Sequence, residues 1–219
     1  MKFVIIFLLL IASSNSYTEI LTKWEKIKER KGVEVFSGDV SGSNIVAFRG
    51  VSTIDAPLEK VISVIYDVSR IKEWMSDLQS SKVIEQKSKF QKIEYNRTSA
   101  PWPLSDRDFI YSVDFKVDKE NKSAEIMIEN ATHQDAPEVP GVIRGELLSS
   151  RYYLKSLENN SKTHIEVEIL ADPKGSIPKW VVNIFQSGWP SNTIFGIKKI
   201  ATEAKYQVHP DIAEFIKTL

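Results

Sequence analysis

The residues best suited to acid–base chemistry are three histidines. His133 lies in a predicted loop, His164 on the polar side of a predicted strand, and His209 directly before a proline. None of them has a serine nucleophile and an acidic partner at a catalytic spacing, and no HExxH metal motif occurs. The histidines therefore predict neither catalytic residues nor metal ligands.

Two pairs of acidic residues are spaced i, i+2, which would place each pair on one face of a strand. They are Asp106/Asp108 and Glu166/Glu168, and solvated strand faces explain such pairs more often than acid–base dyads do. The chain has no cysteine, so thiolate catalysis, disulfides and cysteine-bound metals are excluded. No glycine-rich loop could hold a phosphate. We expect no cofactor and no enzymatic activity.

Two arginines could instead bind an acidic group. Arg97 follows Ile93 and Tyr95 on the more apolar face of a predicted strand, so it either meets a phosphate or carboxylate inside the fold or reaches solvent at the strand end. Arg107 shares a face with Phe109. A salt bridge to a carboxylate beneath the sheet is favoured there over a contact with a ligand.

Composition narrows the class of protein that these residues serve. The chain has 219 residues, with 29 Lys and Arg balancing 29 Asp and Glu, and 42% hydrophobic residues. That composition excludes a disordered chain and a polytopic membrane protein, and zero net charge argues against nucleic-acid binding. No linker or repeat interrupts the chain after its first residues. We expect one globular domain, acting as a monomer.

The first sixteen residues have the layout of a secretory signal peptide. A short basic start is followed by an unbroken apolar run over residues 3–11 and by small or polar residues at 12–16. The run is too short for a membrane-spanning helix, which needs about 20 residues. A buried N-terminal strand or helix is the alternative. We expect cleavage near Ser16 and export of residues 17–219 to a periplasm or the medium.

Hydrophobic spacing predicts the elements that must position the candidate residues. A helical period is found over 18–31, from Asp55 through Ile65, and briefly over 69–75. A two-residue alternation, typical of one-sided strands, then dominates as far as Ala171. The predicted strands are residues 33–37, 45–51, 82–86, 90–98, 107–117, 123–130, 142–157 and 163–171.

The C-terminal part is predicted to be helical and to cover the sheet. One helix runs over 178–186 and a second over 191–206, separated by a break at Gly188-Trp189-Pro190, with Ser191 as the cap of the second helix. A sheet with one apolar face must be covered. The sequence therefore predicts an α+β fold with helices at both ends and a curved antiparallel sheet around the C-terminal helix.

Two motifs resemble those of START domains, the steroidogenic-acute-regulatory-related lipid-transfer family. Residues 101–109 read Pro-Trp-Pro-Leu-Ser-Asp-Arg-Asp-Phe, similar to the family's P-x-P-(L/M)-x-x-R-D-(F/Y) signature. Residues 171–183 are similar to its D-P-x-G-x-(I/L)-P-x-W-(L/V)-V-N entry into the last helix. The resemblance covers about residues 18–206. It implies a helix-grip fold with an internal cavity, whereas the residues alone left an ordinary packed core open.

The resemblance also implies a function and a set of cavity residues. A lipid or other hydrophobic molecule would bind non-covalently, the C-terminal helix would act as a lid, and transfer between membranes would need transient membrane contact. The residues expected around the cavity are Trp74, Met75, Tyr95, Arg97, Arg107, Phe109, Tyr111, Trp180, Ile184, Phe185 and Trp189. Trp189 is expected at the cavity mouth, with packing on the core as the alternative.

One departure limits what the resemblance implies. The phosphatidylcholine-transfer branch has an Asp directly after its Trp in the second helical region, where this chain has Met75 after Trp74. Choline recognition therefore does not carry over. Two other functions stay open: a polyketide-cyclase-like enzyme in the same cavity, which polar groups such as Arg97, Tyr111 or an inward-facing His164 would favour, and a ligand-sensing interaction module, which an exposed apolar patch would favour.

Overall fold

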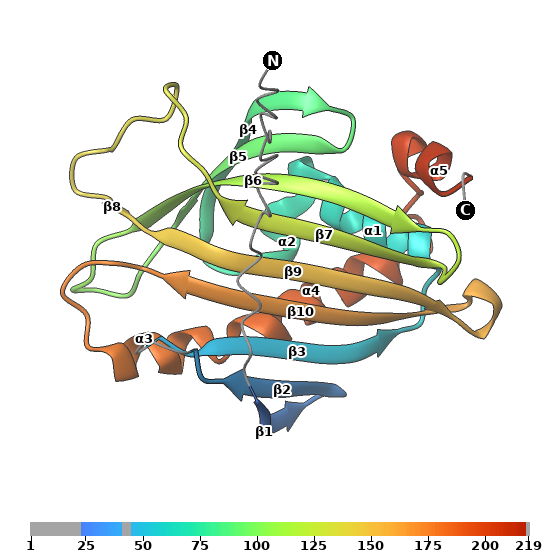
Figure 1. Cartoon of the computed structure of the whole chain (residues 1–219), viewed down its shortest axis with the longest axis horizontal. Helices are drawn as coiled ribbons and strands as arrows, with labels where there is room; N and C mark the ends of the chain where they lie inside the picture. The colour runs from blue at the N-terminus through green and yellow to red at the C-terminus, as the bar shows by residue number, and fades with distance from the viewer. Residues whose placement is uncertain (1–22, 41–44, 218–219) are drawn as a thin grey trace, which may run out of the picture.

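The computed structural model describes residues 23–40 and 45–217, which form a ten-stranded sheet with helices on one side (Figure 1). The strand order is β1-β2-β3-β10-β9-β7-β6-β5-β4, with β8 paired to β6. Neighbouring strands are antiparallel except for the short β6–β8 pair. The strands are β1 (Trp24–Arg30), β2 (Val33–Gly38), β3 (Ala47–Ile54), β4 (Leu78–Ser88), β5 (Gln91–Thr98), β6 (Arg107–Asp118), β7 (Ser123–Asn130), β8 (Ile143–Arg144), β9 (Glu146–Leu157) and β10 (Lys162–Asp172).

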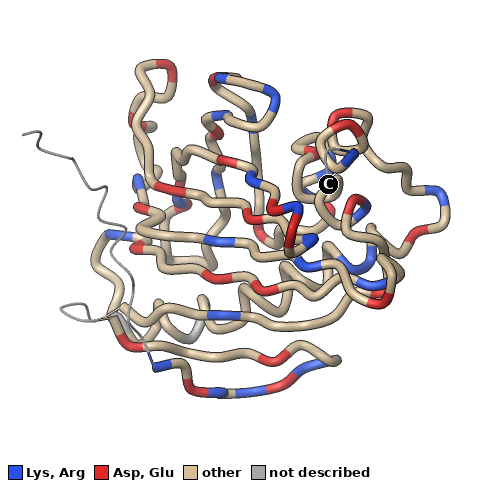
Figure 2. Tube along the Cα trace, turned by 45° about the vertical axis from the view of Figure 1, so that its right-hand side comes forward, with Lys and Arg blue, Asp and Glu red and all other residues tan. Residues whose placement is uncertain are grey.

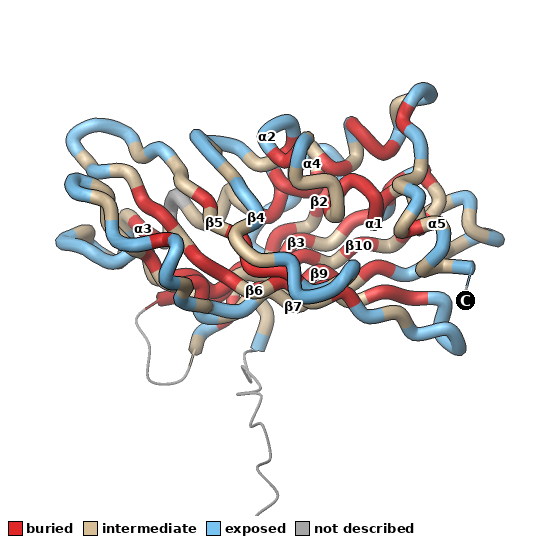
Figure 3. The backbone as a smooth tube through the Cα atoms, turned by 90° about the horizontal axis from the view of Figure 1, so that it is seen from above, coloured by how far each residue is buried: buried red, intermediate tan, exposed pale blue. Residues whose placement is uncertain are grey.

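The helices connect and cover this sheet. Between β3 and β4 lie α1 (Leu58–Tyr66), the 3-10 turn η1 (Val68–Arg70) and α2 (Ile71–Trp74). A second 3-10 turn, η2 (Glu158–Asn160), joins β9 to β10, and α3 (Lys179–Gln186), α4 (Trp189–Ala201) and α5 (Pro210–Lys217) follow. The buried backbone concentrates between the sheet and the helices (Figure 3). The fold is the predicted α+β helix-grip arrangement.

The alternation that predicted the sheet is confirmed on β6 and β10. Tyr111, Val113 and Phe115 belong to the buried core beneath the sheet. Ile165 and Val167 are fully buried on the same side, while their polar neighbours on β10 lie on the outer face. The one-sided strands therefore orient the candidate residues of β6 toward the helices.

The predicted helix over 18–31 is wrong where the structure describes it. Residues 24–30 form β1, the outermost strand, paired with β2. Lys31 and Gly32 have φ values of 50° and 75° and make a two-residue hairpin turn, so Gly32 turns a hairpin instead of ending a helix. The apolar residues at helical spacing were too few to outweigh that turn. Residues 18–22 of the predicted helix lie outside the described residues.

The C-terminal helical part is broken in two as predicted, but the second helix begins two residues earlier than expected. α4 begins at Trp189 and includes Pro190 in its first turn. Backbone N–H groups in a first turn have no partner within the helix, so the N–H that proline lacks costs no helical hydrogen bond there. Ser191 is therefore not its cap; its hydroxyl donates to Gly188 O at 3.0 Å. α4 ends at Ala201, short of the predicted Tyr206, and the separate α5 follows. The predicted strand over 142–157 is likewise split at Gly145 into β8 and β9.

α4 packs on α2 through a contact that only glycine permits. A Cβ at Gly196 would lie 2.4 Å from Trp74 Cα, so α4 and α2 touch backbone to backbone. Ile194 and Ile197 of α4 are fully buried in the core formed with α1 and the sheet. These contacts hold α4 against the sheet and the other helices. Among the described residues, no helix is long and apolar enough to cross a membrane.

Candidate functional site

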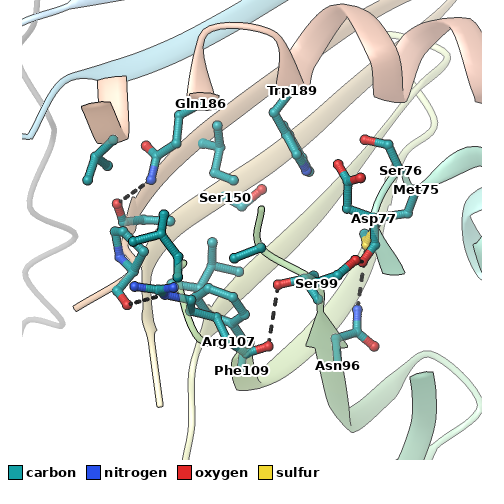
Figure 4. Close-up of a pocket in the computed structure, with 18 of the residues that line it drawn as sticks. Met75, Ser76, Asp77, Asn96, Ser99, Arg107, Phe109, Ser150, Gln186 and Trp189 are labelled. Atoms are coloured by element: carbon teal, nitrogen blue, oxygen red, sulfur yellow. Dashed lines mark hydrogen bonds between the residues drawn. The ribbon is translucent and has the colours of Figure 1, made fainter. Parts of the chain in front are cut away.

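A cavity of about 610 Å³ lies between the inner face of the sheet and the α3–α4 segment (Figure 4). Its remaining walls are the turn after α2 and the β5–β6 loop, whose exposed residues border the opening. The lining residues are Met75, Ser76, Asp77, Asn96, Thr98, Ser99, Ala100, Pro101, Leu104, Arg107, Phe109, Tyr111, Ile128, Leu147, Ser150, Ile169, Ala171, Pro173, Ile177, Val182, Gln186 and Trp189. Most of them are apolar, so the cavity suits an apolar guest with polar contacts at a few places.

Several residues that the sequence predicted around a cavity do line it. They are Met75, Arg107, Phe109, Tyr111 and Trp189. Phe109 and Tyr111 lie on the inner face of β6. Trp189, at the start of α4, points into the cavity from the opposite wall (Figure 4). The Trp189 ring also packs edge-on against the buried Tyr152, 6.5 Å between centroids. Trp189 is thus part of the interior, which agrees with the packing alternative.

Tyr95 and Arg97 do not line the cavity, because β5 presents the opposite face from the one expected. Tyr95 packs on the outer side of the sheet with Ile93, under the loop that follows β7. Arg97 is also on that side, where its guanidinium forms an ion pair with Asp106 at 2.6 Å. That loop buries the apolar outer face of β5. The polar residues that alternate with Ile93 and Tyr95 along the strand, Asn96 among them, face inward.

The remaining predicted residues lie elsewhere. Trp74 is buried against α4 and does not reach the cavity, and its indole Nε1 has no hydrogen-bond partner among the described residues. Trp180 is 67% exposed on α3. The side chains of Ile184 and Phe185 lie outside the described residues.

Arg107 is the cationic residue of the cavity wall. It is only 5% exposed, and its guanidinium donates to two carbonyl oxygens, Ser105 O and, at 3.4 Å, Pro173 O. The Pro173–Gly175 turn closes over it, and φ at Gly175 is +78°. No carboxylate of the described residues forms an ion pair with Arg107, so the expected salt bridge beneath the sheet is absent there. Burial lowers the pKa of Arg107.

A buried charged pair lies deeper on the inner face of β5. Lys92 Nζ and Glu94 Oε1 are 2.8 Å apart, with both side chains 5% exposed. The Tyr111 hydroxyl donates to Glu94 Oε2 at 3.2 Å and accepts a hydrogen bond from Asn96 Nδ2. Burial, and then the charge of Glu94, raise the pKa of Tyr111 well above its ordinary value. Through Tyr111 and Asn96 this pair is connected to the cavity wall.

Sequence reasoning missed this pair and much of the lining. Lys92 and Glu94 alternate with apolar Ile93 and Tyr95, which is the pattern of a solvated face, so no signal in β5 alone would have placed them inside. The apolar alternation of β9 and β10 could have identified Leu147 and the other inward residues of those strands. The β5–β6 loop and α3 also contribute residues to the cavity lining, but which of their residues do so depends on tertiary packing.

The histidines lie away from the cavity. His164 is on the outer face of β10, with Nε2 2.9 Å from Glu166 Oε1. His133 lies in the loop after β7, 3.4 Å from Glu85, and His209 packs on Tyr66. Across residues 23–40 and 45–217, no three His, Asp or Glu side chains are grouped as metal ligands would be. The inward-facing histidine that would favour a cyclase is not observed.

A curved antiparallel sheet that holds a C-terminal helix and leaves an apolar cavity defines a helix-grip protein. The chain belongs to the START domain family, whose profile matches residues 13–202. It is 28% identical to an uncharacterized protein of Pseudomonas aeruginosa, over 81% of this chain and 86% of that protein. It is 24% identical to the phosphatidylcholine transfer protein of Bos taurus, over 73% of this chain and 75% of that one.

Solved structures show the same fold. Human STARD10 superposes with a TM-score of 0.75 at 22% identity, covering 85% of this chain and 77% of that one. A STAR-related lipid transfer protein from Xanthomonas axonopodis gives 0.72 at 24% identity, covering 82% and 99%.

Proposed function

We propose that this protein binds a lipid or similar hydrophobic molecule non-covalently in the cavity and transfers it between membranes. The observation that carries this proposal is the cavity of about 610 Å³ with mostly apolar walls, in a chain of the START family. A lipid chain of about 15 methylenes costs roughly 12 kcal/mol to expose to water, at about 0.8 kcal/mol each. An apolar cavity removes most of that cost.

α3 is the element that would open to admit the ligand. It contributes Val182 and Gln186 to the cavity wall and is joined to the fixed α4 through Ser187-Gly188. Among its described side chains, Gln186 Nε2 donates to Ala171 O at 2.9 Å, and Asn183 Oδ1 accepts from Val46 N at 3.4 Å. Movement of α3 would break these two hydrogen bonds and expose the cavity.

Two exposed tryptophans support transient membrane contact on the same side. Trp102, on the β5–β6 loop, is 93% exposed, and Trp180, on α3, is 67% exposed. Both segments also line the cavity, through Pro101 and Val182. Indole rings favour the interface between lipid and water. A protein seated on a membrane through these rings would place its cavity opening against the lipid.

We further propose a monomer that is exported after removal of residues 1–16 and that binds no nucleic acid. Lys and Arg alternate with Asp and Glu along the chain instead of gathering on one face (Figure 2). N-terminal sequencing of the exported protein tests the cleavage site. We also propose that the protein is not an enzyme, since the named relatives, such as the phosphatidylcholine transfer protein of Bos taurus, are lipid-transfer proteins.

The proposal is tested with the full chain in two steps. Native mass spectrometry of the purified protein, mixed with vesicles of mixed lipids and separated again, should show a hydrophobic adduct that organic extraction removes. Transfer of a fluorescent lipid between two vesicle populations should then fall in Trp102→Ala and Trp180→Ala, whereas the adduct persists. A bare protein that takes up no lipid contradicts binding. An adduct without vesicle-to-vesicle transfer leaves a binding or sensing role.

A further inference from the structure

Arg107 is a buried cation that forms no ion pair with a carboxylate of the described residues, although the charge of Asp106 acts on it from a distance. Its guanidinium contacts only carbonyl oxygens, and among the described residues no carboxylate pairs with it. The adjacent acid, Asp106, is held on the other side by Arg97 at 2.6 Å and by Gln79 at 3.0 Å. The next acid, Asp108, is held by Arg144 at 2.6 Å. A buried charge left without a partner is costly, so a partner from outside the chain would be favoured.

The cavity has room for a lipid chain. If each methylene takes about the 30 Å³ that a water molecule takes in the liquid, one chain of about 16 carbons needs roughly 480 Å³. The cavity has about 610 Å³, so one chain with a small head group fits.

The polar and apolar parts of the wall are arranged for such a molecule. Arg107 stands where β6 begins, beside the β5–β6 loop that borders the opening, and Tyr111 and Ile128 lie further along the inner face of the sheet. A head group at Arg107 would leave its chain pointing along Phe109 toward those residues. The guanidinium fork is well suited to two oxygens of one anion.

We infer that the ligand is a single-chain lipid with an anionic head group, a carboxylate or a phosphate, and that Arg107 binds this head group. The inference rests on the proposed function, since it names the ligand class of the same cavity. The guanidinium would keep its bonds to Ser105 and Pro173 and direct its remaining N–H groups to the anion. Arg107 would thus select among lipids by charge.

The test compares three ligands with the same twelve-carbon chain, laurate, dodecyl phosphate and the neutral 1-dodecanol, each displacing the neutral dye Nile red from the full chain. We expect both anions to bind about tenfold more tightly than dodecanol, as a charge-assisted hydrogen bond allows. In Arg107→Gln this preference should disappear, while dodecanol binding stays within about twofold. Arg151→Gln, which alters an arginine paired with Glu125 on the outer face, is the matched control and should keep the preference.

Each other outcome overturns a defined part of the account. Dodecanol binding as tightly as the anions to the unaltered protein, or Arg107→Gln weakening all three ligands equally, overturns the inference and leaves the proposed function standing. Inorganic phosphate alone binding as tightly as dodecyl phosphate would mean a site for the free anion. A two-chain phosphatidylcholine adduct in native mass spectrometry refutes the single-chain limit. Failure of every ligand contradicts the proposed function itself. If Arg107→Gln does not fold, Arg107→Lys replaces it and should retain part of the preference.

Discussion

The two buried charged sites on the inner face of the sheet differ in what neutralises them. Lys92 and Glu94 face each other at 2.8 Å on β5, and Tyr111 adds a hydrogen bond. Arg107, at the beginning of β6, is just as buried but contacts only carbonyl oxygens. The first site is completed by the chain itself. The second, at the cavity, is complete only with an anion from outside.

This difference separates a structural from a functional part of the same surface. Around Lys92 the space beneath the sheet is filled, with Tyr66 and Phe115 rings within 6 Å of its ammonium group. Around Arg107 the space is hollow. Burial of a charged side chain therefore does not by itself mark a binding residue. Burial of a charged side chain that has no oppositely charged partner does.

The largest effect is expected from breaking the complete pair. Lys92→Met leaves Glu94 buried and unpaired, which should lower the free energy of unfolding by about 3–5 kcal/mol. Urea unfolding at neutral pH measures it. The double variant Lys92→Met/Glu94→Met should recover most of the loss, because no unpaired charge remains. A loss below about 1 kcal/mol in the single variant would show that the pair is not a structural unit.

Filling the cavity with a larger side chain should weaken binding without unfolding the protein. Leu147 lines the cavity, and its neighbour Leu148 is 46% exposed on the other side of β9. Leu147→Trp should weaken laurate binding by about tenfold or more, because the indole takes part of the volume that the chain needs. Leu148→Trp is the matched control. Equal binding by both variants would place the ligand elsewhere.

Removing the incomplete charge should affect stability less than breaking the pair. Arg107→Gln loses charged hydrogen bonds to two carbonyl groups but also removes an uncompensated buried charge, so the free energy of unfolding should change by only about 1 kcal/mol. Urea unfolding of Arg107→Gln and Lys92→Met under the same conditions compares their free energies of unfolding directly. A loss as large as that of Lys92→Met would assign Arg107 a mainly structural role.

The smallest effect concerns Tyr111, which connects the two sites. Burial raises its pKa in the folded state, so the stability it contributes is complete below the ordinary value of 10.0 and is lost as pH rises above it. The difference in unfolding free energy between the unaltered protein and Tyr111→Phe should therefore narrow above pH 10. Unfolding series between about pH 8 and 11 measure this difference. A constant difference would contradict the burial of the hydroxyl.

Much of the fold could be predicted from the sequence because its strands are one-sided. On β6 and β10 the inward positions Tyr111 to Phe115 and Ile165 to Val167 are apolar at every second residue, and the structure confirms their orientation. The two family motifs placed Arg107 and Phe109 correctly at the entry to β6. The start of α1 was likewise marked by apolar residues at helical spacing.

The errors occurred where local pattern and tertiary packing disagree. β5 carries Lys92 and Glu94 inward and Tyr95 outward, because a loop distant in sequence buries its outer face. Residues 24–30 have helical spacing but pair as a strand across the Lys31-Gly32 turn. Neither the covering loop nor the missing partner of Arg107 is visible in a linear sequence, since both depend on which residues meet in space.

The most direct test of the account is a crystal structure of the full chain with laurate that carries bromine at its methyl end. We predict one anomalous peak inside the cavity, near Tyr111 and Ile128, with the carboxylate within hydrogen-bonding distance of the Arg107 guanidinium. A bromine peak on the outer face of the sheet, or an empty cavity at saturating ligand, would contradict the claim that this cavity holds the lipid.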